Sequence, residues 1–496
     1  MVDLQNMKNL SEKNFPSAVH MKWIMTVLLG YFGLRLLFFA VAISGYLPPD
    51  EVTHLGLSQV FKSFFLPANT SETYEYGLVT NISWLYYWLM GKLLWLNVFG
   101  LPDLLFLRLL NIPFAFGTIY FAWRLLLLFT TDRLAQVLLV VVMTNTLMFS
   151  FLSASVTYDN LTNLLGIMAI YYLFAYFKER AVSLLFISFL CQLAGCLTKL
   201  SFLPLALVLV LLWLLREFRE LKHLPTTIKN YCQGSGGRCL FLMFALLCAL
   251  ILNLQLYGGN YIQYGQLRPS MYDVLSADIA LENRIAARDV ILQYFKDGRL
   301  DYGQAMRMTR FIPHPGDRAD TVFLLQNFLD HKVNGYDVLS PLEYVPTWVK
   351  GVAATSFGVM GHFSIPNTGL TIAPIGVLMF LALLGFAVRW RKGNLEGLAV
   401  YLTLLFTAYL IILMYVHNYQ LYLYYENLSM GLQGRYLFPI IGAFYVWFSY
   451  SLTHLFQRQG LRLGLVVVAA LIFFLNDFPF FLYHVTPEWF GPYSPF

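Results

Sequence analysis

The feature that most constrains this chain is a succession of apolar stretches, each close to the length that crosses a lipid bilayer. An α-helix needs about 20 apolar residues to span the hydrocarbon core. Hydrophobic residues make up 58% of the 496 positions and charged residues only 12%. Because lipid offers no hydrogen bonds, the backbone of each stretch must bond to itself, as a helix does. The sequence therefore predicts an all-α polytopic membrane protein whose first apolar run remains as an anchor.

Residues 82–99 decide the predicted topology. This stretch has the length of a span, but Lys92 lies in its middle and Trp and Tyr side chains are frequent in it. Aromatic rings prefer the headgroup region, where a lysine amine can reach water. We therefore expect an interfacial helix here. The remaining stretches are about 11 predicted spans: 23–44, 105–129, 134–153, 160–177, 181–197, 200–215, 239–257, 371–389, 396–416, 436–456 and 463–483.

The basic side chains support this topology, because cytoplasmic loops carry an excess of Lys and Arg. With 82–99 on the surface, every basic cluster faces the cytoplasm together with the N-terminal lysines; if 82–99 crossed, every cluster would lie outside. The basic groups are Lys8, Lys13 and Lys22, Arg124/Arg133, Lys178/Arg180, the 216–238 loop, Arg389/Arg391/Lys392 and Arg458/Arg462. The net charge of +6 therefore indicates a cytoplasmic N-terminus in the cell inner or plasma membrane, and no nucleic-acid partner.

This topology divides the chain into three parts. Residues 1–257 form an N-terminal membrane module with spans 1–7 and juxtamembrane helices in 45–104, residues 258–370 form an exterior loop or cap, and residues 371–496 form a C-terminal module with spans 8–11. The loop is too long to be a plain connector. None of the five cysteines lies in an exterior segment, so the exterior part does not rely on disulfides. The other exterior segments are the tip 157–160, the turn 197–201 and the loop 417–435.

The segment after the first span, Gly45–Gly56, contains adjacent carboxylates and a histidine. Pro48 and Pro49 cannot continue the preceding helix. Asp50 would then be the N-cap of a new helix, with Glu51 in its first turn and His54 on the same side. A carboxylate at this depth serves as a base, a metal ligand or only a cap, and the residues alone leave these alternatives open.

Three further charged residues lie at the same exterior surface and are functional candidates by default. Asp159 precedes a span and is expected to cap the helix that starts at Asn160. Lys199 lies in a turn within apolar sequence, where snorkelling to water is the alternative to a functional role. Arg435 begins a span from outside, against the charge trend, which favours binding of a phosphate or carboxylate. Arg35 is expected to be an internal ion-pair partner, whereas Arg108 could be either a partner or a substrate group.

The sequence also lacks the common soluble catalytic motifs. It contains no Walker A motif, no Gly-x-Gly-x-x-Gly after a strand and no His-Glu-x-x-His. A soluble nucleotide-binding domain is therefore excluded. If the protein is an enzyme, its activated substrate is expected to be carried by a lipid and to enter from the bilayer.

Several motifs resemble a known superfamily. Pro49–His54 resembles the acidic signature of the GT-C superfamily, which comprises polytopic glycosyltransferases that use polyprenyl-phosphate sugars. The chain is more closely similar to a bacterial branch with Pro-Pro-Asp-Glu-x-x-His, here Pro48–His54, and Gly-x-Gln-Gly-Arg-Tyr, here within Gly431–Pro439. Lys199–Leu205 resembles a third motif, and Ser356–Gly361 departs from a fourth by one residue in its glycine spacing.

The resemblance implies a GT-C-like bundle with exterior juxtamembrane helices, an exoplasmic loop domain and a catalytic N-terminal module. It implies sugar transfer, with inversion, from a polyprenyl-phosphate donor to a hydroxyl of a glycan, lipid or protein at the exoplasmic face. Asp50 would be the general base, and Glu51 and His54 would orient it or the sugar. The implied substrate-binding residues are Asp159, Lys199, Gln433, Arg435 and Tyr436, with Lys199 and Arg435 on the phosphate. No cofactor and no metal ligand are predicted, and the sequence does not decide whether a divalent cation takes part.

Two other functions remain as alternatives at this point. A transporter or flippase of a lipid-linked glycan also places charged residues in spans, but such proteins usually show paired halves and broken helices near the midplane. Here the polar candidates gather at one face and no half-chain repeat is visible, which favours the enzyme. A receptor or assembly subunit without catalysis is the third possibility.

Overall fold

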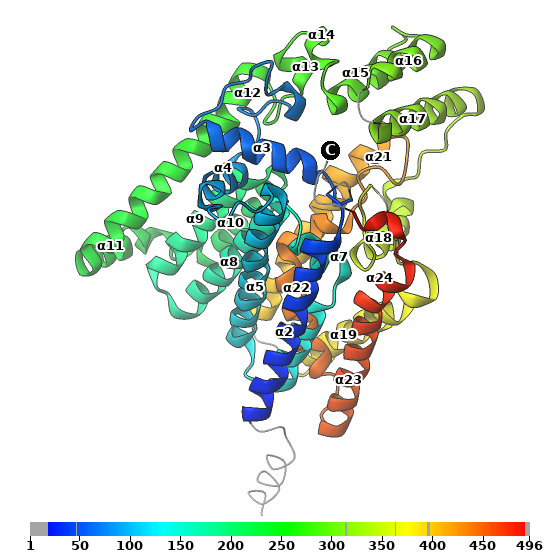
Figure 1. Ribbon diagram of the computed structural model, residues 1–496. Coiled ribbons are helices and arrows are strands. Elements are labelled where there is room, and N and C mark those ends of the chain that lie inside the picture. The colour runs from blue at the N-terminus through cyan, green and yellow to red at the C-terminus, as the bar shows by residue number, and fades with distance from the viewer. Residues whose placement is uncertain (1–17, 46, 313–314, 363, 394–396, 492–496) are drawn as a thin grey trace, which may run out of the picture.

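The computed structural model describes residues 18–491 except 46, 313–314, 363 and 394–396. The described part is helical, without a strand, and has two isolated bridges, Ile43 with Phe490 and Val359 with Ile365. Long helices stand side by side in a bundle, and short helices gather at one end of it (Figure 1). We call this group the short helices, although α17 has 20 residues; it comprises α13 (Met271–Val274), α14 (Ala277–Ala280), α15 (Arg284–Lys296), α16 (Tyr302–Met308), α17 (Pro315–Asn334) and α18 (Pro341–Ser356). The predicted all-α polytopic class is confirmed.

Nine helical runs in the described part are long and apolar enough to cross a membrane: Val19–Ala42, Asp103–Phe129, Tyr158–Glu179, Leu200–Glu217, Gly236–Tyr264, Gly369–Arg391, Gly397–Tyr425, Gly434–Thr453 and Gln459–His484. The helices α6 (Arg133–Thr144) and α7 (Leu147–Ser153) are together long and apolar enough as well, with a bend of 66° between them. The apolar helix α9 (Val182–Thr198) has 17 residues. These helices overlap the predicted spans in the same order along the chain.

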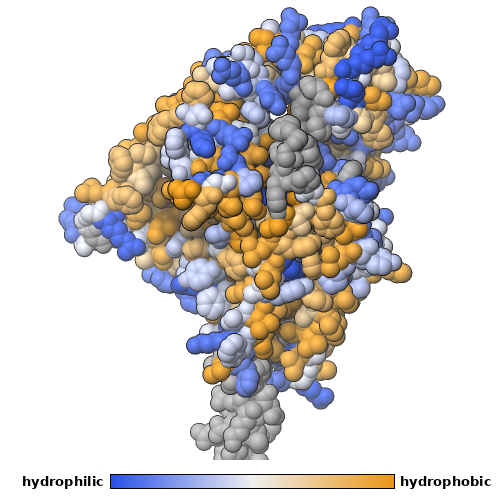
Figure 2. Space-filling model, in the orientation of Figure 1, coloured by the Kyte–Doolittle hydropathy of each residue, from blue (hydrophilic) through white to orange (hydrophobic). Residues whose placement is uncertain are grey.

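The helices of the bundle carry the following labels and bounds. They are α2 (Ala18–Ala42), α5 (Asp103–Phe129), α8 (Tyr158–Glu179), α10 (Leu203–Glu217), α11 (Leu224–Asn253), α12 (Gly259–Tyr264), α19 (Ala373–Arg391), α20 (Gly397–Ile412), α21 (Tyr419–Tyr425), α22 (Ile441–Thr453), α23 (Gln459–Leu475) and α24 (Phe478–His484). Exposed apolar side chains cover the sides of the bundle, as on Leu240, Phe241 and Phe244 of α11, and hydrophilic residues lie toward its two ends (Figure 2). This pattern fits a bundle surrounded by lipid.

Two runs extend further than the sequence predicted. The run that contains α11 continues through a π-helical segment, Leu254–Gly258, and the run that contains α20 continues through another, Leu413–Asn418. Polar side chains beyond the apolar stretches find partners there: Asn260 bonds to Asn81, and Asn418 accepts a hydrogen bond from Trp348 at 3.0 Å. The loop predicted at 417–435 is therefore wrong in its first part, because the helix continues to Tyr425.

A buried ion pair supports the break between α6 and α7. Arg35 of α2 pairs with Asp477, and its Nη2 donates to the carbonyl of Thr144 at 2.5 Å. A helix break within a bilayer leaves carbonyl groups without intrahelical donors, so a buried guanidinium satisfies one of them. The prediction that Arg35 is an internal ion-pair partner is confirmed.

The helices α3 (Glu51–Ser63) and α4 (Leu85–Leu93) lie at the end of the bundle that carries the short helices (Figure 1). With nine residues, α4 rises about 13 Å, too little to cross a core of about 30 Å. A Cβ on Gly91 would lie 2.5 Å from the carbonyl oxygen of Ser58, so α3 and α4 are in close contact. Lys92 is half-buried, and its Nζ donates to the carbonyls of Phe61 and Phe64 at 2.9 and 3.1 Å, because the end of α3 leaves these acceptors free.

Two sequence-based expectations concern the opposite end of the bundle. Lys8 and Lys13, which suggested a cytoplasmic N-terminus, lie outside the described residues. Cys232 and Cys239 of α11 form a disulfide. Cys232 lies in the 216–238 loop, which was predicted to be cytoplasmic, and Cys239 begins the next predicted span. The segments predicted to be exterior contain no cysteine.

Candidate active site

Asp50 occupies an unusual backbone conformation at the start of α3. Its φ of 57° and ψ of 14° lie in the left-handed region, which Asp and Asn adopt more readily than most residues. Its carbonyl accepts the first helical hydrogen bond, from His54 N at 2.9 Å. Asp50 is the N-cap residue of α3, as predicted, but its side chain makes no cap hydrogen bond, because such a bond usually needs an extended backbone. The carboxylate instead faces Arg435, whose Nη2 lies 3.4 Å from Oδ2.

The neighbouring carboxylate, Glu51, forms a buried ion pair with Arg108. Arg108 of α5 donates to it through Nε at 2.9 Å and Nη2 at 2.5 Å, and the backbone N–H of Val156 donates to Oε1 at 2.7 Å. Arg108 Nη1 also donates to the carbonyls of Ala40 and Ile43 at the end of α2. The pair therefore joins α2, α3, α5 and the segment before α8. Arg108, for which two roles were open, is an ion-pair partner.

Asp159 lies at the beginning of α8 and is fully buried. Thr157, with an extended backbone, is the actual N-cap and accepts from Asp159 N at 3.3 Å. The prediction that Asp159 caps the helix is therefore wrong, because the helix starts before it. Its carboxylate is used elsewhere: Lys199 Nζ lies 2.5 Å from Oδ1, and Arg435 Nη1 lies 3.6 Å from Oδ2.

Lys199 follows the last residue of α9, and its side chain is 9% exposed. Besides Asp159, the ammonium faces the rings of Tyr158 and Tyr436, with centroids at 4.6 and 5.3 Å. Aromatic faces attract cations, most strongly where water is excluded. Snorkelling to water is therefore wrong for Lys199, because the amine is directed inward to a carboxylate.

Arg435 bridges the two aspartates. Nη2 faces Asp50 and Nη1 faces Asp159, and Nε donates to Gln433 Oε1 at 2.6 Å. The residue before it, Gly434, allows this placement, because a Cβ there would lie 2.2 Å from Ser356 Oγ at the end of α18. Arg435 is 4% exposed, and its Nη1 has no hydrogen-bond partner within the described residues. The guanidinium thus retains capacity for a bound anion.

His54 lies one turn after Asp50 and is 3% exposed. Its Nδ1 is 2.9 Å from the hydroxyl of Tyr87, and its ring packs edge-on against Tyr158 at 4.5 Å. Burial lowers the pKa of His54 to about 4, so the ring is neutral at pH 7. Its other nitrogen, Nε2, is buried without a hydrogen-bond partner among the described residues. This leaves one neutral polar atom for a bound group.

The structure thus brings together most of the predicted site residues: Asp50, His54, Asp159, Lys199, Gln433, Arg435 and Tyr436. Glu51 is directed instead to Arg108. Their roles as catalytic and substrate-binding groups remain predictions. Among the described residues, no group of three or more His, Cys, Asp or Glu side chains is arranged to hold a metal ion.

Two residues near the site were missed by the sequence reasoning. Arg268, in the segment after α12, is exposed; burial raises the pKa of Tyr87, and the charge of Arg268 acts against this rise. Asn163 lies one turn after Asp159 on α8, and its buried amide has no partner among the described residues. Neither residue belongs to a recognisable motif. The one sequence signal for Asn163 is its position four residues after Asp159, which puts both on the same side of a helix.

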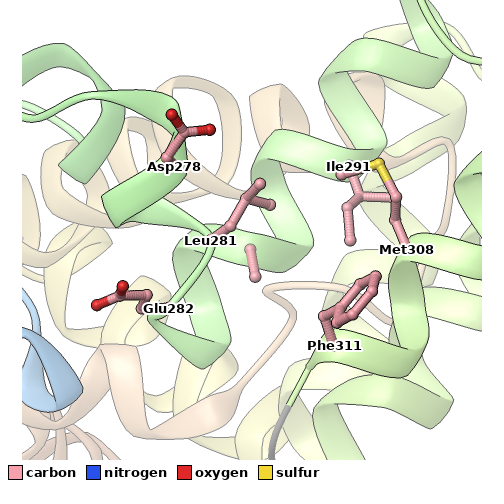
Figure 3. Close-up of a pocket in the computed structure, with 7 residues that line it drawn as sticks. Asp278, Leu281, Glu282, Ile291, Met308 and Phe311 are labelled. Atoms are coloured by element: carbon pink, nitrogen blue, oxygen red, sulfur yellow. The ribbon is translucent and has the colours of Figure 1, made fainter.

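A separate cavity lies among the short helices. It has a volume of about 310 Å³ and is lined by Asp278, Leu281, Glu282, Ala287, Ile291, Met308 and Phe311. Figure 3 shows the two carboxylates on one side, and Ile291, Met308 and Phe311 on the other. None of the predicted site residues lines this cavity.

The fold and site together define a class: an integral multi-pass membrane protein with a cluster of alternating charges at one end of its helices. No protein-family model matches the chain, and no curated protein matches it. One solved structure, ArnT from Cupriavidus metallidurans in the apo state, is similar to this chain with a TM-score of 0.37 and a sequence identity of 11%. The similarity covers 88% of this chain and 78% of that chain.

Proposed function

We propose that this protein is a GT-C-type membrane glycosyltransferase that moves a sugar from a polyprenyl-phosphate donor to a hydroxyl of a glycan, lipid or protein. The observation that carries the proposal is the row Asp50, Arg435, Asp159 and Lys199, in which each charge faces an opposite one. A transfer of this kind needs a carboxylate for the acceptor proton and cations for the leaving phosphate. The motif resemblance described above supports the same reaction.

Asp50 suits the proton acceptor. Its side chain is 40% exposed, whereas that of Asp159 is fully buried, so an acceptor hydroxyl can approach only Asp50 without displacing protein groups. In the proposed step the acceptor oxygen attacks the anomeric carbon and Asp50 takes its proton. The bond from that carbon to the phosphate oxygen breaks, and the electron pair leaves with the phosphate. A single displacement inverts the anomeric centre.

Arg435 and Lys199 suit the phosphate. Both are buried cations, and the contacts of Arg435 with Asp50 and Asp159, at 3.4 and 3.6 Å, are longer than a strong charge-assisted hydrogen bond. A phosphate can therefore compete for the guanidinium. The release of Asp50 from Arg435 when the donor binds would increase its ability to accept a proton.

The proposal places the site on the exoplasmic face, with the lipid of the donor in the bilayer and no cofactor. The test is transfer of labelled sugar from synthetic polyprenyl-phosphate sugars to envelope glycans, lipids or proteins by the purified chain in proteoliposomes. New glycosidic bonds that are absent with Asp50→Asn support the proposal. Movement of a lipid-linked glycan across the bilayer without a new bond would instead identify a flippase.

A further inference from the structure

The last turn of α18 holds the backbone directly before Arg435. Gly434 is the first residue of a short 3₁₀ helix, Gly434–Ile440, and the first N–H groups of a helix find no acceptor within it. The side chain of Thr355 supplies one, because Gly434 N lies 2.7 Å from Thr355 Oγ1. Thr355 is 6% exposed, so this hydrogen bond is shielded from water, where the loss of one partner is most costly.

The hydroxyl of Thr355 acts as donor and acceptor at once. It donates to the carbonyl of Gly351, one turn earlier in α18, at 2.8 Å, and it accepts from Gly434 N. A hydroxyl has one hydrogen and two lone pairs, so the bond within the helix uses the hydrogen and leaves a lone pair for Gly434. A valine here would have the same shape but would leave the N–H of Gly434 without this acceptor.

Two further contacts hold the same segment against α18. A Cβ on Gly351 would overlap the side chain of Leu432, so the helix and the segment are in close contact. The carbonyl of Gly431 accepts from Asn418 Nδ2 at 2.6 Å, and Asn418 accepts in turn from Trp348 of α18 at 3.0 Å. The helix therefore supports this segment at several points along its length.

The end of α18 is also joined to the segment before Asp50. Asn367 N donates to the carbonyl of Ala354 at 3.0 Å, so the chain that follows α18 turns back onto the helix. Within this turn, His362 N donates to the carbonyl of Leu47 at 3.1 Å, three residues before Asp50. The end of α18 and the turn after it thus contact both segments whose charges meet in the site.

We infer that Thr355 is a positioning residue for donor binding: its bond to Gly434 fixes the orientation of the Arg435 guanidinium. In that orientation the two Nη atoms face Asp50 and Asp159. The inference rests on the proposed function and adds to it a residue that acts only through Arg435. A guanidinium is a planar fork that bonds two oxygens of a phosphate in one orientation, so a small displacement of its backbone weakens the contact.

The test measures the affinity of the purified full-length chain for isoprenyl phosphate, together with its melting temperature. We expect Thr355→Val to weaken binding by about tenfold, because the N–H of Gly434 loses its acceptor and the segment shifts. Thr355→Ser restores the hydroxyl and should return the affinity to within about twofold of the parent. Should Thr355→Val fail to fold, Thr355→Cys replaces it with the same expected direction, since a thiol is a weak acceptor.

Thr118→Val is the matched control. Thr118 of α5 is 1% exposed, and its hydroxyl donates to the carbonyl of Phe114 in the same helix at 2.8 Å. This variant should keep the parent affinity. Parent-like affinity of Thr355→Val, with a lowered melting temperature, would make Thr355 a purely structural residue and overturn the inference while the proposed function stands. Absence of binding by the parent chain overturns the proposed function, and the inference with it.

A double-mutant cycle tests whether Thr355 acts through Arg435. Substitutions that act on one contact have non-additive effects. Lysine has a flexible stem without a planar fork, so its ammonium tolerates a shift of the backbone. In the Arg435→Lys background, Thr355→Val should therefore weaken binding by less than about threefold. A full loss of about tenfold in that background contradicts a role through the guanidinium.

Discussion

Asp50 and Arg435 are separated by 385 positions in the chain, yet Arg435 Nη2 lies 3.4 Å from Asp50 Oδ2. The first residue follows α2 and the second precedes α22, so the contact joins the beginning and the end of the membrane bundle. It also combines the two motifs that most resemble GT-C enzymes.

Asp50→Asn should abolish most transfer activity while the fold is retained. Asn tolerates the left-handed backbone about as well as Asp, but it cannot accept the acceptor proton, and general base catalysis is worth about 10²–10⁴-fold in rate. The measurement is sugar transfer alongside thermal stability, with the exposed Asp337→Asn as control. Parent-like activity of Asp50→Asn would exclude it as the base.

Arg435→Lys should weaken binding of isoprenyl phosphate by about tenfold, because lysine keeps the charge but loses the planar fork that bonds two oxygens at once. Lys199→Ala should weaken it as well. Binding is measured by titration of the purified variants, and the exposed Lys350→Ala is the control. A residue whose replacement leaves the affinity unchanged does not contact the phosphate.

Glu51→Gln should lower the stability of the fold, and any loss of transfer activity should follow from that loss of stability. Glu51 and Arg108 are 1% and 0% exposed, and the loss of one partner of a buried pair costs about 3–5 kcal/mol. Replacing both by methionine should cost less than the sum of the single changes, because no unpaired charge remains. Unfolding in detergent measures this. A stable but inactive Glu51→Gln would instead indicate direct contact with the substrate.

His54 should make stability depend on pH. Its pKa is lowered to about 4 from 6.5 by burial, so between these values the unfolded chain binds more protons than the folded chain. Its contribution is therefore complete above pH 6.5 and declines toward pH 4, by up to about 1.4 kcal/mol per pH unit. The melting temperature of His54→Gln should change less across this range, whereas that of the exposed His223→Gln should follow the parent. Parallel curves for His54→Gln and the parent would contradict a buried neutral histidine.

The topology predicts opposite sides for two exposed positions. In a variant without native cysteines, Cys at Thr226 should react with impermeant reagents only from the cytoplasm, and Cys at Arg299 only from outside. This outcome follows if 82–99 does not cross, as the length of α4 indicates. The reverse labelling would place the site on the cytoplasmic face.

The sequence alone determined the class of fold and the order of the crossings. Both follow from local properties, because about 20 consecutive apolar residues suffice to satisfy a bilayer whatever the rest of the chain does. Charged residues that interrupt this pattern are costly in lipid, so Asp159, Lys199 and Arg435 could be recognised as candidates before any contact was known.

Only the tertiary structure decided which charges meet. The sequence placed Glu51 beside Asp50 as an orienting residue, but in the structure its carboxylate is paired with Arg108, 57 positions away. Thr157 caps α8 and so frees Asp159 for Lys199. Such pairings depend on packing between segments distant in the chain, and local patterns contain no information about that packing.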